Sequence, residues 1–131
     1  MNTSSQALFT HNAIAFFDQT AKQDQLTVPE FCLLECTNVI WKQVRFNGLP
    51  RQDAENMVQT LSLLRLKRAP VKALLKRALT IGLNHQLAVY DSSYIALAEH
   101  YRTSFVTIDV RQQQAALAEH IAIKALTDFK L

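Results

Sequence analysis

Short β-prone runs alternate with longer segments of helical periodicity in this chain, and this alternation constrains its fold most. The runs at 26–28, 63–67, 105–108 and 123–126 are separated by segments whose apolar residues recur every three or four positions. Strands separated by helices favour a mostly parallel sheet that is covered on both faces. The 131 residues include only 2 Gly and 3 Pro, too few for the tight turns of an all-β sandwich. We therefore expect a helix-rich α/β fold.

Proline and glycine signal where the helices begin and end. A proline in the first helical turn loses no hydrogen bond, and Pro29, Pro50 and Pro70 each stand at such a position. Asn47-Gly48 and Gly82 are typical left-handed stops. Together with apolar periodicity, these signals predict helices over 11–25, 30–46, 50–64, 70–82 and 111–120, and one that begins near Asp91. The residues expected to face inward on the helix over 30–46 are Phe31, Leu34, Val39, Ile40 and Val44.

Composition and cysteine usage limit the class of protein. Hydrophobic residues make up 49% of the chain and charged residues 19%, which excludes a disordered protein. We expect a single domain over 1–131, with a polar lead over 1–10 that can remain disordered. Cys32 and Cys36 are spaced for one helical face and predict buried thiols, which fit a reducing compartment. The sequence shows no signal peptide and no membrane-spanning run, so we expect a cytoplasmic protein without membrane association.

Basic charge is concentrated in one stretch. The chain has 14 Lys plus Arg against 11 Asp plus Glu, but no acidic residue lies between Asn56 and Tyr90. A basic stretch of this kind can attract phosphates, although a solvated helix face has the same pattern. The candidate nucleic-acid contacts are Arg65, Lys67, Arg68, Lys72, Lys76 and Arg77.

Three acidic residues stand where a catalytic site could form. Asp109 directly follows the run at 105–108, Asp91 begins the helix that precedes this run, and Glu35 lies in an otherwise apolar helix segment. Each has an ordinary alternative, because Asp91 and Asp109 could be helix N-caps and Glu35 could be a solvated position. If they converge, three carboxylates repel one another unless a divalent cation neutralises them. Oxygen ligands of this type suit Mg²⁺ or Mn²⁺.

Three sequence blocks together resemble PIN-domain proteins of the VapC toxin type. They are Val28-Pro29-Glu30-Phe31 continuing through Glu35 and Asn38, the block YDSSYIALAE from Tyr90 to Glu99, and Val106-Thr107-Ile108-Asp109. The resemblance implies a three-layer α/β/α fold with a short, mostly parallel sheet. It also implies a homodimer that cleaves RNA with Mg²⁺ or Mn²⁺ and is held inactive by a cognate antitoxin. Glu35, Asp91 and Asp109 match the family's acidic positions, and Thr107 or Asn38 would orient groups by hydrogen bonds.

The chain departs from this family at its N-terminus. The family opens with a strand ending in Asp-x-Ser, whose Asp completes the acidic site, whereas we expect no apolar strand before Ala13. Asn2-Thr3-Ser4 and Asp18 are poor substitutes for that motif. Two functions therefore stay open: a metal-dependent single-stranded RNA endonuclease that uses three carboxylates, and an N-terminally shortened, weak or inactive PIN-like protein that binds an antitoxin or another partner. An upstream start in the coding sequence would also account for the departure.

Overall fold

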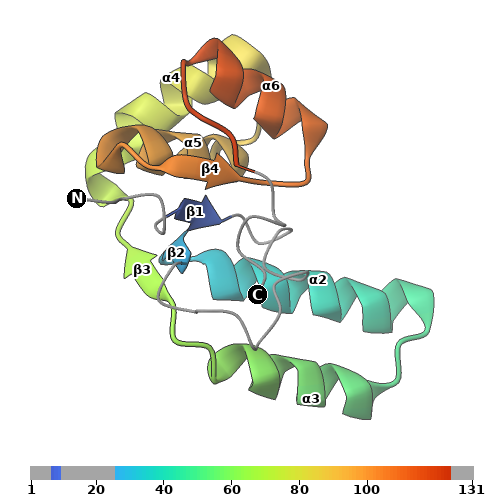
Figure 1. The fold of residues 1–131 in the computed structure, drawn as a ribbon. Coiled ribbons are helices and arrows are strands. Elements are labelled where there is room, and N and C mark those ends of the chain that lie inside the picture. Colours follow the sequence, from blue (N-terminus) through green and yellow to red (C-terminus); the bar gives the residue numbers. More distant parts are fainter. Residues whose placement is uncertain (1–6, 10–25, 125–131) are drawn as a thin grey trace.

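A parallel four-stranded sheet forms the centre of the molecule. The computed structural model describes residues 7–9 and 26–124. The sheet has the order β3-β2-β1-β4, and every neighbouring pair is parallel. With the labels of Figure 1, the strands are β1 (Ala7–Phe9), β2 (Leu26–Pro29), β3 (Lys67–Ala69) and β4 (Ser104–Val106). The predicted short parallel sheet is confirmed.

Helices cover this sheet on two sides, as Figure 1 shows. A hairpin of α2 (Cys32–Asn47) and α3 (Arg51–Ser62) lies on one side. On the other side lie α4 (Leu75–His85), preceded by the 3₁₀ turn η2 (Lys72–Leu74), together with α5 (Val89–Tyr101) and α6 (Val110–Ala118). The expected α/β/α layering is therefore present.

The strand that we expected to be missing is present, so that prediction was wrong. β1 occupies Ala7–Phe9, inside the segment interpreted as a polar lead, and it lies between β2 and β4. Its register pairs Ala7 with Leu26 and with Ser104. A strand of three residues is too short to show a periodicity, and its two neighbours supply its hydrogen bonds. The helix predicted over 11–25 lies outside the described residues, as do Asn2-Thr3-Ser4 and Asp18.

The buried face of α2 differs from the predicted one. The helix buries Cys32, Cys36 and Ile40, which recur every four residues, and both thiols are free as expected. Leu34 and Val39 were expected to face inward but are 73% and 42% exposed. α2 carries apolar residues on more than one face, and periodicity alone does not identify the face that meets the sheet. The predicted left-handed stop is confirmed, because Gly48 has φ 76°.

Gly82 was predicted to end a helix, but α4 continues through it to His85, and Gln86 takes the left-handed conformation with φ 54°. The reason for a glycine here is close packing. A Cβ at position 82 would lie 2.9 Å from the carbonyl oxygen of Leu87 and 3.2 Å from Oγ of Ser92. Gly82 therefore lets α4 approach the start of α5, where the Ser92 hydroxyl donates a hydrogen bond to the Ala78 carbonyl at 2.6 Å.

Two predicted strands are also shifted. The run predicted at 63–67 forms β3 two residues beyond its expected end, at Lys67–Ala69. The run predicted around 123–126 contributes an isolated parallel bridge between Phe105 and Ile123, while 125–126 lie outside the described residues. Both shifts concern element boundaries, which depend on the neighbouring strand more than on local propensity.

Candidate active site

Asp91 lies in the first turn of α5 rather than at its N-cap. Ala88 is the N-cap residue and the helix begins at Val89, so the interpretation of Asp91 as a cap is wrong. A carboxylate in the first turn is stabilised by the partial positive charge of the helix N-terminus. The Asp91 backbone carbonyl accepts a hydrogen bond from Nε2 of Gln112, on α6, at 3.2 Å.

Asp109 follows β4 and is the N-cap of α6. Its Oδ1 accepts a hydrogen bond from the backbone N–H of Gln112 at 3.1 Å, which confirms the capping interpretation. The backbone N–H of Asp109 donates to the Thr107 hydroxyl oxygen at 3.1 Å. Thr107 is buried and therefore fixes the backbone from which the Asp109 carboxylate projects.

Gln112 joins these two acidic positions, and sequence reasoning missed it. Its side chain is 1% exposed and accepts a hydrogen bond from the Thr107 hydroxyl at 2.6 Å, in addition to its bond to Asp91. A buried amide of this kind is stable only when its polar atoms have partners. Its position three residues after a predicted cap was the only local signal. Gln112 thus ties the starts of α5 and α6 to each other.

Glu35 lies in the first turn of α2 and faces α5. Its Oε1 accepts a hydrogen bond from the Tyr94 hydroxyl at 2.5 Å. Tyr94 lies three residues after Asp91, so this bond places Glu35 beside the first turns of α5. The sequence predicts Tyr94 as a core or interface residue and gives no sign of this contact with Glu35. Asn38 lies one turn further along α2 and is exposed.

The three predicted carboxylates therefore come from three helix starts at one region of the molecule. α2 follows β2 and α6 follows β4, and because these strands are parallel to β1 their carboxyl ends lie at the same edge of the sheet. Within residues 7–9 and 26–124, however, no three His, Cys, Asp or Glu side chains form a group that could hold a metal ion. The starts of α2, α5 and α6 therefore lie near one another, but among the described residues their carboxylates do not form a complete set of metal ligands.

The chain matches known proteins over most of its length. The family model described as "PIN domain" matches residues 7–127.

The chain belongs to the PIN-domain family.

Curated relatives of this PIN domain carry ribonuclease names. Ribonuclease VapC3 of Pyrobaculum aerophilum is 31% identical over 91 residues, which cover 68% of this chain and 70% of that protein. VapC ribonuclease Mb0985 of Mycobacterium bovis and ribonuclease VapC9 of Mycobacterium tuberculosis are each 31% identical over 101 residues, covering 77% of this chain and 78% of theirs.

A solved structure shows the same fold. The crystal structure of PAE2754 from Pyrobaculum aerophilum superposes with a TM-score of 0.73 at 22% sequence identity, covering 94% of this chain and 85% of that one. The family and the fold that the sequence blocks predicted are both confirmed.

This PIN domain differs from the Asp-x-Ser pattern at the first strand. β1 ends at Phe9, and the sequence continues as Thr10-His11-Asn12. Threonine therefore follows the strand where the family pattern has aspartate. The remaining donors are carboxylate oxygens, which fit Mg²⁺ or Mn²⁺ better than a softer metal. Mg²⁺ keeps several waters and needs only one or two protein carboxylates, so an open donor set of this kind fits it.

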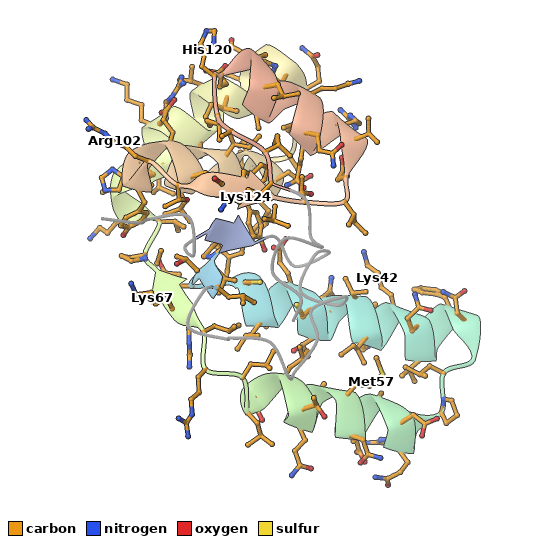
Figure 2. All side chains as sticks on the ribbon, in the orientation of Figure 1. Lys42, Met57, Lys67, Arg102, His120 and Lys124 are labelled. Atoms are coloured by element: carbon orange, nitrogen blue, oxygen red, sulfur yellow. The ribbon has the colours of Figure 1, made fainter. Side chains whose placement is uncertain are left out.

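The basic residues of this PIN domain fall into two groups. Arg65, Lys67, Arg68, Lys72 and Lys76 are exposed, and Lys67 with Arg68 lies on the edge strand β3, where Figure 2 labels Lys67. Arg77 differs, because it forms ion pairs with Glu99 at 2.8 Å and with Glu119 at 2.7 Å. Its charge is already neutralised by two carboxylates, so it is a poor phosphate contact.

The Arg77 cluster extends to His85. Nε2 of His85 lies 2.8 Å from Glu119, so the cluster joins α4, α5 and the end of α6. The hydrogen bonds to Glu99, followed by that to Glu119, raise the pKa of Arg77. Hydrogen bonds from Arg77 lower the pKa of Glu99, and those from His85 and Arg77 lower the pKa of Glu119. The cluster stabilises the fold and lies outside the candidate active site.

The helices that the structure describes include none long and apolar enough to cross a membrane.

Proposed function

We propose that this PIN domain is a metal-dependent endonuclease that hydrolyses phosphodiester bonds in single-stranded RNA, as a VapC-type toxin. The observation that carries the proposal is the joining of three acidic helix starts at one edge of the sheet, through Tyr94 to Glu35 and through Gln112 to Asp91 and Asp109. The ribonuclease names of relatives that share 31% of aligned residues support the same chemistry.

Each residue has a defined task in the proposed mechanism. A bound Mg²⁺ or Mn²⁺ would activate water and stabilise charge on the attacked phosphate. Glu35, Asp91 and Asp109 would hold it. Thr107 keeps the Asp109 backbone in place, while the exposed Asn38 can donate hydrogen bonds to the substrate.

The exposed basic residues would bind the RNA backbone. The residues that remain as proposed contacts are Arg65, Lys67, Arg68, Lys72 and Lys76, all exposed. Because they act through phosphate charge, RNA binding should weaken as the salt concentration rises. We further propose a cytoplasmic homodimer with a cognate antitoxin, a location that fits the free thiols of Cys32 and Cys36.

A second function is favoured by one observation. Threonine rather than aspartate follows β1, so the site has one carboxylate fewer than the family pattern. Metal affinity depends on the number of charged ligands. A PIN-like protein that binds an antitoxin or another partner with weak or no catalysis is therefore the alternative.

The deciding experiment is cleavage of a mixed-sequence single-stranded RNA with Mn²⁺, with Mg²⁺ and with EDTA. We expect cleavage that needs the metal and disappears in Asp109→Asn. This substitution keeps a good N-cap for α6, so a loss of activity reports on the carboxylate charge. Cleavage by the variant at the parent rate would show that the site assignment is wrong.

Thr10→Asp separates the two functions. We expect the added carboxylate to strengthen Mn²⁺ binding about tenfold, with Thr10→Asn as the uncharged control. A parent chain that is folded but inactive, beside an active Thr10→Asp variant, would favour the second function, a PIN-like protein with weak or no catalysis. Equal Mn²⁺ affinity in all three proteins would show that position 10 lies away from the metal.

A further inference from the structure

Tyr94 is a buried polar side chain that the proposed mechanism has not yet used. It lies in the middle of α5 and is fully buried, with an exposed fraction of 0%. Its ring meets the Phe31 ring edge-on, with the ring centres 5.5 Å apart. Its hydroxyl donates to Oε1 of Glu35 at 2.5 Å, across the boundary between α5 and α2. The phenol is therefore held at both its ring and its hydroxyl.

The hydrogen bond to Glu35 belongs to the strong class. An O–H donor to a carboxylate oxygen gives a short bond, about twice as strong as one between neutral groups. The Tyr94 hydroxyl can donate a hydrogen bond, and the Glu35 carboxylate can only accept one, so the roles of the two groups in this bond are fixed. A glutamate on a helix surface would otherwise sample several rotamers. Here one carboxylate oxygen is held against a helix that is buried from Ser92 to Ala98.

The location of this bond connects it with the metal. Tyr94 lies about one helical turn after Asp91, so the residue that contacts Glu35 belongs to the same helix as a second candidate ligand. Side chains that hydrogen-bond to metal ligands orient them and adjust metal affinity. A fixed Glu35 would not have to be ordered when the ion arrives.

We propose that Tyr94 is a positioning residue that holds the Glu35 carboxylate in the orientation in which it ligates the divalent ion. This inference rests on the proposed nuclease function. A purely structural role would be different, because the ring alone would fill the core and phenylalanine would serve as well. The two roles predict different results when only the hydroxyl is removed.

Mn²⁺ binding without RNA is the primary test. Bound and free Mn²⁺ are measured by electron paramagnetic resonance for the parent chain, for Tyr94→Phe and for Tyr101→Phe. The control removes a hydroxyl from the exposed far end of the same helix. We expect Tyr94→Phe to weaken Mn²⁺ binding about 10- to 100-fold and the control to bind as the parent does.

The rate of RNA cleavage gives a second readout. The Mn²⁺ concentration for half-maximal cleavage by Tyr94→Phe should rise by the same factor as the dissociation constant, while the rate at saturating Mn²⁺ falls much less. Thermal unfolding in EDTA sets a measuring temperature at which all variants are folded. An unchanged Mn²⁺ affinity in folded Tyr94→Phe would overturn the proposal.

A double variant tests whether Tyr94 acts through Glu35. In a Glu35→Gln background, Tyr94→Phe should cause no further loss of Mn²⁺ affinity, because the carboxylate it positions is gone. A further loss as large as in the parent would contradict the proposal. A parent chain that neither binds Mn²⁺ nor cleaves RNA would overturn the proposed function and this inference together. If the parent chain binds Mn²⁺ and cleaves RNA, and Tyr94→Phe binds Mn²⁺ with the same affinity as the parent, only this inference is overturned.

Discussion

α5 and α2 both carry a candidate ligand in their first turn, but the molecule surrounds them very differently. Every residue of α5 from Ser92 to Ala98 is buried, and α4, α6 and the sheet pack around it. α2 buries only Cys32, Cys36 and Ile40, while Trp41 and Phe46 in its far half are exposed. Asp91 is therefore carried by a helix that is buried along most of its length, and Glu35 by a helix whose buried residues end at Ile40. The Tyr94 bond joins the two.

The largest change in the free energy of unfolding is expected for a matched pair of core substitutions. Ile95 on α5 is fully buried, whereas Ile40 is the last buried residue of α2 and is followed by the exposed Trp41. We expect Ile95→Ala to lower the free energy of unfolding by about 4 kcal/mol and Ile40→Ala by about 2 kcal/mol. Urea denaturation measures both values. Equal losses would mean that the two helices are packed to the same degree, and the comparison would fail.

Removing the Gln112 amide, which links α5 to α6, is expected to cause an intermediate loss of unfolding free energy. Gln112→Leu fills a similar volume but leaves the Thr107 hydroxyl and the Asp91 carbonyl without this partner. We expect a loss of about 2 kcal/mol in unfolding free energy and a lower cleavage rate. Gln114→Leu is the control, since Gln114 is exposed on the same helix. Full activity in Gln112→Leu would show that the link between α5 and α6 is not needed to place the carboxylates.

The Arg77 cluster is expected to make the smallest contribution to the unfolding free energy. The direction in which this contribution changes with pH follows from the pKa values of its two glutamates. The pKa values of Glu99 and Glu119 are lowered in the folded chain, so their contribution to stability is present above the ordinary glutamate pKa and is lost as the pH falls through the folded values. Both side chains are partly exposed, which limits the contribution to about 1 kcal/mol. Between about pH 6 and about pH 3, Glu119→Gln should lose less unfolding free energy than the parent. A parallel pH profile would show that the cluster does not stabilise the α4–α5–α6 side.

Local patterns predicted the elements that have local signals. β2 coincides with the β-prone run at 26–28, α3 begins after Pro50, and Asp109 follows β4 as the residue that caps α6. The family blocks identify Glu35, Asp91 and Asp109 as matches to the family's acidic positions from the sequence alone. These features depend on residues within a few positions of one another.

The features that the sequence did not reveal depend on distant partners. Tyr94 and Glu35 are 59 residues apart, and Gln112 and Asp91 are 21 apart. β1 is a strand because β2 and β4 lie on either side of it. A glycine at position 82 is explained by the close packing of the start of α5 against α4. None of these partners can be identified from a window of a few residues.

The central place of β1 has a consequence for how the protein is made. β1 is synthesised before β2, β3 and β4, but its neighbour β4 lies about a hundred residues later, at Ser104–Val106. Domains emerge from the ribosome N-terminus first, and pairings between distant segments are slow to form. The β1 edge that pairs with β4 therefore stays unpaired until Ser104–Val106 has emerged. The edge of the sheet from which α2 and α6 start is therefore completed only after β4 has paired with β1.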